Sequence, residues 1–389
     1  MKDATKKMKG RLFCAVLSFL LIMNCIGCIE AVDIPYSQIT TEDAVFEEKF
    51  YFSRLNEEEQ LVYKEIYQGI LEHNEEIYVH SKDAKKVNEI LASVIYDFGE
   101  IFWIDGSVSS TAYEESVWND EYTVIEPTYI CTLEERKLRE QEIESVVGQI
   151  VNDVPAEYTE YETIKYIYEY LINNVRYVEE APDNQNIYSA LVGKETVCAG
   201  YAKANQYLLN RMGMYCTYVI GTAAAEDAFE SHAWNIVRCN DAYYYVDITW
   251  ADPVEAEEQA DIQLELLYDY LCCSETQLGE THIPDENYDY PECVSDDLNY
   301  YRMNQMYYET VNRDQLLNAM YASVDAKENS TIFKFSDSVL YQEANSLVLQ
   351  DLINPATERL ARKYGLTEVR YSYEEQEPMN KLVIYWFYE

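Results

Sequence analysis

The clearest structural signal in this chain is the stretch SHAWNIVRCNDAYYYVDITW, residues 231–250. Two runs rich in β-branched and aromatic residues flank Asn-Asp at positions 240–241, a dipeptide that favours a two-residue turn between antiparallel strands. A turn there places His232 and Asp247 as diagonal neighbours on one face of the strand pair. A loop shifted to positions 239–240 would place them directly opposite each other, again on one face. Both registers predict a hairpin that brings a histidine and a carboxylate together.

Upstream of this hairpin, the run TVCAGYA, residues 196–202, predicts the start of a helix. Thr196 is a residue type that caps helices, so we expect Cys198 in the first helical turn, and Gly213 ends the helix. The unpaired N–H groups and the positive end of a helix stabilise a thiolate there. A cysteine taken alone is more often a small buried apolar residue. The nearby His232 makes a reactive cysteine the better interpretation.

A histidine between a cysteine and a carboxylate has a defined chemical use. The carboxylate accepts one ring N–H, which fixes the tautomer and stabilises the imidazolium. The other ring nitrogen can then take the proton of the thiol. The sequence therefore predicts Cys198 as nucleophile, His232 as base and Asp247 as orienting acid.

The runs VCAGYA (197–202), HAWN (232–235) and YVDITW (245–250), with Gly221 before the second, resemble the transglutaminase-like superfamily. The resemblance implies a papain-like Cys-His-Asp core in which a helix packs on an antiparallel sheet. It carries the three roles onto Cys198, His232 and Asp247 in the family's chain order.

The sequence departs from the family pattern at Thr196, where a glycine often stands, and at Ala251, where an acid is common. Neither position is one of the three predicted catalytic residues. For the second oxyanion donor we favour Tyr188 among the polar residues before the cysteine. No calcium-loop pattern is present, and the cysteines lack the paired spacing of zinc ligands, so no metal and no cofactor are predicted.

Apolar periodicity divides the rest of the chain. We predict a mostly helical N-terminal domain over residues 34–153, the transglutaminase-like core over 154–255, and an accessory α+β region over 256–389. Within the first, Asn56 predicts a helix start and residues 102–104 predict a short strand. The predicted fold class is α+β.

The N-terminus has the pattern of an export signal, because positive residues precede an apolar run at 12–23 that is too short to span a bilayer comfortably. Gly27-Cys28 resembles a bacterial lipoprotein processing site. We therefore predict a signal peptide over residues 1–27, lipidation of Cys28, and a location on the extracellular face of the membrane. A retained N-terminal anchor and ordinary cleavage with secretion are the alternatives, and membrane contact is expected through this segment alone.

The formal net charge is −42 and the isoelectric point is near 4.3. A surface this acidic repels nucleic-acid phosphates and anionic lipid headgroups, so we expect no nucleic-acid partner. The charge is best explained as a solvated surface that keeps the protein soluble, with binding of a basic partner as the alternative.

These features together predict a cell-surface thiol hydrolase that cleaves peptide or amide bonds through an acyl-enzyme. Its partner would be a peptide or protein substrate, with cell-wall peptide among the candidates. One alternative is acyl transfer from protein glutamine to an amine, which cross-links proteins. Another is a non-catalytic surface interaction module with a vestigial triad. In the simplest alternative, Cys198 is only a core residue and the hairpin is only part of the scaffold.

Overall fold

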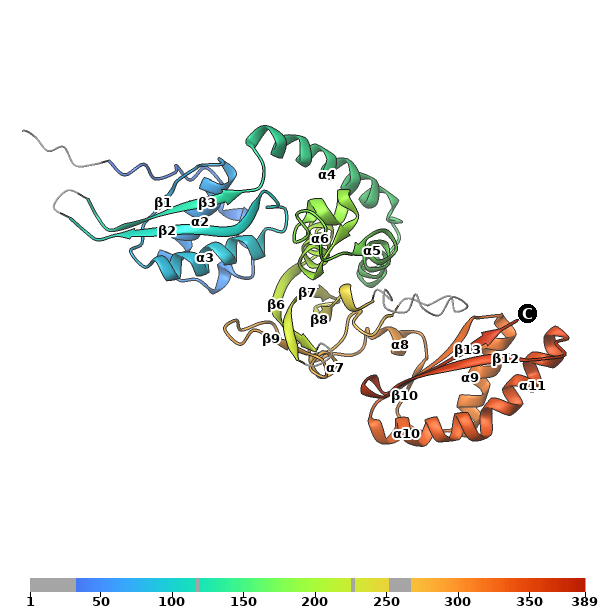
Figure 1. Cartoon of the computed structure of the whole chain (residues 1–389). Coiled ribbons are helices and arrows are strands. Elements are labelled where there is room, and N and C mark those ends of the chain that lie inside the picture. The colour runs from blue at the N-terminus through green and yellow to red at the C-terminus, as the bar shows by residue number, and fades with distance from the viewer. Residues whose placement is uncertain (1–32, 117–118, 225–227, 252–266, 389) are drawn as a thin grey trace, which may run out of the picture. The chain divides into compact units, whose positions relative to one another are not determined.

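The structure is a computed structural model that describes residues 33–116, 119–224, 228–251 and 267–388 (Figure 1). The predicted signal peptide and the lipidation candidate Cys28 lie outside the described residues. Among the described residues, helices accompany small sheets whose strand pairs are mostly antiparallel, which confirms the predicted α+β class. In the part of the chain that the structure describes, no helix has both the length and the apolar character needed to cross a membrane.

The chain divides into two compact units. The first comprises the described residues of Met1–Glu42 together with Leu55–Ala92 and Ser107–Pro127, and the second comprises Asp43–Arg54, Ser93–Gly106 and the described residues from Thr128 onward. The domain boundaries predicted after residues 153 and 255 stay predictions.

Helices predominate in the N-terminal region, and a small sheet accompanies them. The elements are α2 (Glu57–Leu71), β1 (Ile77–Val79), α3 (Ala84–Asp97), β2 (Ile104–Tyr113) and β3 (Tyr122–Tyr129), with strand order β1-β3-β2. Asn56 caps α2 in a capping box with Glu59, as predicted. The strand predicted at residues 102–104 is misplaced, because β2 begins where that strand should end. Beyond Ile104, β2 is polar and mostly exposed, so it lacks the apolar alternation that marks a strand in sequence.

The second unit contains the helix and sheet that the sequence predicts as the core. Helix α6 (Cys198–Arg211) packs on strands β6 and β7 and also contacts α5. The four-stranded sheet has the order β8-β7-β6-β9, and its neighbours pair antiparallel. The bounds are α4 (Leu133–Asp153), α5 (Glu160–Asn174), β6 (Cys216–Ala224), β7 (Phe229–Cys239), β8 (Ala242–Val246) and β9 (His282–Pro284).

The hairpin between β7 and β8 has the register that the Asn-Asp signal predicts. Cys239 pairs with Ala242, and Asn240 and Asp241 have φ of 50° and 62°. Both turn residues are therefore left-handed, a conformation that asparagine and aspartate tolerate better than other side chains. The shifted loop at positions 239–240 is excluded.

Gly221 lets strand β9 approach the sheet. It pairs with His232 on one side and with Pro284 on the other. A Cβ atom at this position would lie 2.2 Å from the Ile283 carbonyl oxygen and 2.9 Å from the Pro284 Cα atom. These are backbone atoms, so β9 itself would have to move to relieve the clash.

We therefore expect Gly221→Ala to lower the free energy of unfolding by about 3 kcal/mol, measured by urea denaturation. The matched control is Gly148→Ala on α4, where an added Cβ atom meets nothing within 4 Å. Because alanine favours helix, the control should gain about 0.5–1 kcal/mol. Equal stability of Gly221→Ala and the unmodified protein would contradict the close approach of β9.

The C-terminal region is a second α+β layer, as predicted. Its sheet has the order β10-β11-β13-β12, and a cluster of buried residues that includes Leu316, Phe333 and Leu360 joins sheet and helices. The bounds are α7 (Glu275–Leu278), α8 (Tyr300–Met303), β10 (Tyr307–Tyr308), α9 (Arg313–Ala326), β11 (Ser330–Phe335), α10 (Ser338–Leu347), α11 (Ile353–Tyr364), β12 (Arg370–Gln376) and β13 (Lys381–Phe387).

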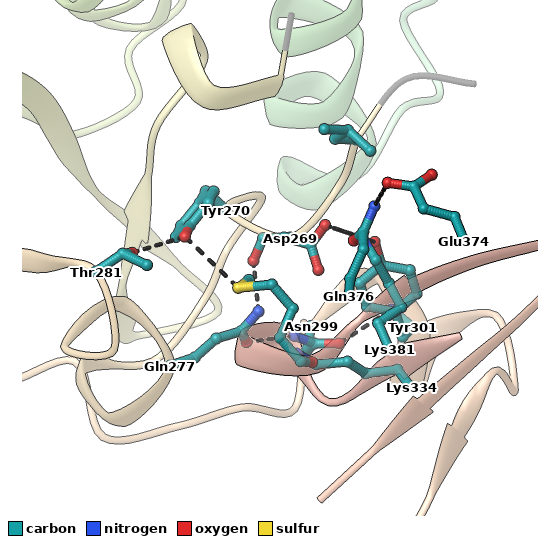
Figure 2. Close-up of polar contacts among 12 residues, drawn as sticks. Asp269, Tyr270, Gln277, Thr281, Asn299, Tyr301, Lys334, Glu374, Gln376 and Lys381 are labelled. Atoms are coloured by element: carbon teal, nitrogen blue, oxygen red, sulfur yellow. Dashed lines mark hydrogen bonds and ion pairs between the residues drawn. The ribbon is translucent and has the colours of Figure 1, made fainter. Parts of the chain in front are cut away.

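A buried polar cluster joins this sheet to the segment that follows the β7–β8 hairpin (Figure 2). The Lys381 ammonium on β13 forms an ion pair with Asp269, and their side chains are 1% and 5% exposed. The Tyr301 hydroxyl donates to the same carboxylate oxygen at 3.1 Å and accepts from Lys381 at 3.1 Å. Lys334 donates to the Met379 carbonyl oxygen beside them. The buried ion pair therefore links the C-terminal sheet to the segment that contains Asp269, and solvent does not screen its charges.

Candidate active site

Cys198 is the first residue of α6, as the sequence predicts, but the cap differs. Val197 is the N-cap residue and offers no side-chain hydrogen bond, so the prediction of Thr196 as the cap is wrong. The Thr196 hydroxyl instead donates to the Asn184 carbonyl oxygen at 2.6 Å. A Cβ atom on Gly200 would lie 1.8 Å from this hydroxyl, so a glycine is needed there. Thr196 therefore packs closely against Gly200 in the first turn of α6 while its hydroxyl bonds to the preceding segment.

Cys198 differs from the other described cysteines in exposure. It is partly exposed, and the remaining six are buried and form no disulfide. Burial raises the pKa of those six thiols, that of Cys239 to about 12. Reagents in solution should therefore reach Cys198 first. The buried six are Cys131, Cys216, Cys239, Cys272, Cys273 and Cys293.

His232 on β7 joins Cys198 and Asp247. Its Nε2 atom lies 2.7 Å from Asp247 Oδ2, and Cys198 is close enough to contribute to the raised pKa of His232. Since Nε2 faces the carboxylate, Nδ1 is the nitrogen left for the sulfur. Burial alone would lower the pKa of His232, but the Asp247 carboxylate and Cys198 outweigh burial and raise it to about 10. The imidazolium is therefore the favoured form at neutral pH.

Asp247 follows the end of β8 and is 1% exposed. Burial would raise the pKa of this carboxyl, but His232 and His282 lower it well below its usual range. The Thr249 backbone N–H donates to Oδ1 at 2.8 Å. Oδ2 accepts hydrogen bonds from Nε2 of His232 at 2.7 Å and from Nε2 of His282 at 3.0 Å. Three donors thus hold the carboxylate in its charged form.

His282 on β9 is absent from the site predicted by sequence. It lies outside every motif and 35 positions after Asp247, on a strand of three residues that shows no periodic pattern. The one available signal was that the chain has only four histidines. Pairing of β9 with β6 brings it to the site, and that pairing belongs to the tertiary structure.

The three groups His232, Asp247 and His282 offer ligand atoms within 4.8 Å of one another, a spacing at which a metal ion could be held. Both imidazole Nε2 atoms, however, point at the same carboxylate oxygen at hydrogen-bonding distance. Ligand atoms that each lie about 2.0–2.2 Å from a tetrahedral metal ion are about 3.4 Å apart, and the 2.7 Å separation of His232 Nε2 and Asp247 Oδ2 fits a hydrogen bond better. We therefore assign the group to hydrogen bonding.

Tyr188, the predicted oxyanion donor, has its hydroxyl engaged elsewhere. The hydroxyl donates to Glu142 Oε2 at 2.8 Å, and the ring lies under the Arg139 guanidinium. Its role stays a prediction. Tyr177, which the sequence did not single out, lies on β4 (Arg176–Tyr177) opposite Thr196 of β5 (Glu195–Thr196). Burial, and the charges of Cys198, Glu179, Glu230 and Asp247, raise the pKa of Tyr177 to about 12.

Residues 146–248 match the family model of the transglutaminase-like superfamily. The match includes all three predicted catalytic residues and confirms the resemblance seen in the motifs. None of the curated proteins matches this chain in sequence.

Two solved structures illustrate how far the likeness extends. A TGase matches with a TM-score of 0.26 and 14% identity, over 45% of this chain and 50% of its own length. A candidate cysteine protease from Cytophaga hutchinsonii matches with a TM-score of 0.26 and 12% identity, over 39% of this chain and 65% of its own. The chain spans less than two thirds of either structure, and likeness at this level carries no argument about activity.

Proposed function

We propose that this chain, whose residues 146–248 carry a transglutaminase-like core, is a cysteine hydrolase that cleaves peptide or amide bonds through an acyl-enzyme. The observation that carries the proposal is the hydrogen bond of His232 to Asp247, with the partly exposed Cys198 at the start of α6 close enough to affect the pKa of His232. Together these residues supply a nucleophile, a proton carrier and an orienting acid. The N-terminal sequence supports a location at the cell surface, attached through Cys28.

The first half of the reaction forms a thioester. The Cys198 sulfur attacks the substrate carbonyl carbon, and the carbonyl electrons move onto oxygen. The N–H groups of the first turn of α6 and the Tyr177 phenol are the candidates that we propose to stabilise that oxyanion. Collapse of the tetrahedral intermediate breaks the C–N bond, and the His232 imidazolium donates its proton to the leaving amine.

The second half releases the acid. Neutral His232 takes a proton from water, the water oxygen bonds to the thioester carbon, and the C–S bond breaks to regenerate the thiolate and the imidazolium. An amine in place of water would give acyl transfer by the same steps. The nucleophile that resolves the thioester therefore distinguishes hydrolysis from cross-linking.

The test is alkylation of the full-length protein by limiting iodoacetamide at pH 6, with adducts located by mass spectrometry. An ordinary cysteine, with a pKa of about 8.5, is almost wholly protonated at pH 6. Because the imidazolium stabilises the thiolate, we expect Cys198 to react tens of times faster than an ordinary exposed cysteine. His232→Ala should remove this advantage.

A positive result would be followed by a peptide-library digest with and without a fluorescent amine, with Cys198→Ser as the inactive control. New peptide termini indicate hydrolysis, and incorporation of the amine indicates transfer. If Cys198 reacts no faster than the buried Cys131 or Cys216, the enzyme proposal fails and a non-catalytic interaction module replaces it.

A further inference from the structure

The His282 side chain is completely enclosed. Its exposed fraction is 0%, and three aromatic rings surround it, with centroid distances of 4.8 Å to Trp250, 5.0 Å to Tyr270 and 5.1 Å to Trp234. Trp234 and Trp250 also lie beside His232, at 5.7 Å and 6.3 Å. One aromatic enclosure therefore holds both histidines and excludes water from the space around Asp247.

Hydrogen bonds within this enclosure form a continuous series. His282 Nε2 lies 3.0 Å from Asp247 Oδ2, and its Nδ1 lies 2.8 Å from the Thr281 hydroxyl. The Thr281 hydroxyl lies 2.7 Å from the Tyr270 hydroxyl. One direction of donation satisfies every member: Tyr270 donates to Thr281, Thr281 donates to Nδ1, and Nε2–H donates to the carboxylate. This direction of donation places the Nε2–H of His282 on the carboxylate.

The carboxylate oxygen that orients His232 is thus shared with a second imidazole. Two Nε2–H groups converge on Asp247 Oδ2, at 2.7 Å and 3.0 Å. The Thr249 N–H holds Oδ1 at 2.8 Å, and the two imidazoles together fix the position of Oδ2, the oxygen that orients His232. The strand that supplies the second donor can reach the site because residue 221 is a glycine.

We propose that His282 is a positioning residue that extends the triad to a Cys198–His232–Asp247–His282 series, an inference that rests on the proposed cysteine chemistry. His282 holds Asp247 Oδ2 at the position from which it orients His232. The outer end of the series is set by Thr281 and Tyr270. His282 is fully enclosed and its Nε2 faces Asp247, so it acts through Asp247.

Two substitutions distinguish the effect of the His282 hydrogen bond from the effect of its ring volume. His282→Phe keeps a ring in the enclosure and removes the donor. His282→Gln can place an amide N–H close to where Nε2–H lies, so it keeps the donor to Asp247. We expect His282→Phe to slow alkylation of Cys198 at pH 6 roughly 10- to 100-fold, a range typical of outer-shell partners. His282→Gln should recover the rate to within about threefold.

Imidazole NMR of the ¹⁵N-histidine-labelled full-length protein reads the bond directly, because the chain has only four histidines. The unmodified protein should show two downfield Nε2–H protons, from His232 and His282. His282→Phe should lose one and move the other, because Asp247 then serves a single imidazole. His282→Gln should lose the His282 signal and leave that of His232 close to its original position.

Several outcomes would overturn the proposal. An Nδ1–H tautomer of His282 in the spectra would contradict it, as would downfield signals that change when metal is chelated. Alkylation of Cys198 in His282→Phe at the unmodified rate would also contradict it. So would a His282→Gln protein that folds but is alkylated as slowly as His282→Phe. The spectra require no reactivity at Cys198. If Cys198 proves unreactive while both Nε2–H signals are present, the proposed function has failed and the hydrogen-bonded series has not.

Discussion

Replacing Asp247 with asparagine should slow the alkylation of Cys198 at pH 6 about 100-fold, and peptide hydrolysis on the order of a thousandfold or more. The carboxylate raises the pKa of His232 to about 10 against the opposing effect of burial. Without that charge, burial prevails and the pKa of His232 falls, so the imidazole loses its proton and no longer stabilises the thiolate. One amide oxygen also cannot reproduce a carboxylate that accepts from three donors.

The stability of this variant should depend on pH in a defined direction. Asp247 has a lowered pKa in the folded protein, so its contribution is present above about pH 4 and is lost as the pH falls. His232 has a raised pKa, so its contribution is full below about pH 6.5 and is lost as the pH rises through about 10. The deficit of Asp247→Asn relative to the unmodified protein should therefore be largest between about pH 4 and 6.5.

Asp241→Asn is the matched control, because it makes the same chemical change at an exposed turn position of the same hairpin. Its alkylation rate should stay within about twofold of the unmodified protein. Alkylation of Asp247→Asn within tenfold of the unmodified rate would remove Asp247 from the catalytic series and leave His232 to act alone.

Asp269→Asn should lower the free energy of unfolding by about 3–5 kcal/mol, because it leaves the Lys381 ammonium buried without its counterion. Solvent cannot screen this charge, since the Lys381 side chain is 1% exposed. Lys381→Met should have a similar effect, since it leaves the carboxylate of Asp269 unpaired. The double variant should be more stable than either single variant, because it buries no net charge. Urea denaturation followed by tryptophan fluorescence and circular dichroism measures all three.

The control for this ion pair is Asp351→Asn on the exposed pair between Arg313 and Asp351. The two groups lie 3.4 Å apart and their side chains are 52% and 61% exposed. Solvent screens such a pair, so the change should stay within about 0.5 kcal/mol. If Asp269→Asn is no more destabilising than this control, the buried cluster does not tether the C-terminal sheet.

The parts of the site that could be predicted from sequence are those set by local periodicity and turn chemistry. The Asn240-Asp241 turn determines the β7–β8 register, and that register places His232 and Asp247 on one face. The placement of Cys198 in the first helical turn depended only on where the helix starts, so the wrong prediction of Thr196 as the cap did not change it. The sheet formed by β1, β2 and β3 was missed, because the polar, exposed residues of β2 carry no alternating signal.

The sequence directly shows the order of cysteine, histidine and aspartate along the chain. It also shows the spacing that brings the histidine and the aspartate together, because period-two alternation and a two-residue turn act over short distances. His282, Tyr177 and the buried pair of Lys381 with Asp269 could not be read in this way. His282 lies 35 positions from Asp247, and Lys381 and Asp269 are separated by 112 positions. Which long-range pairs form depends on packing of the whole core and on close approaches such as that at Gly221, and no local pattern in the sequence records them.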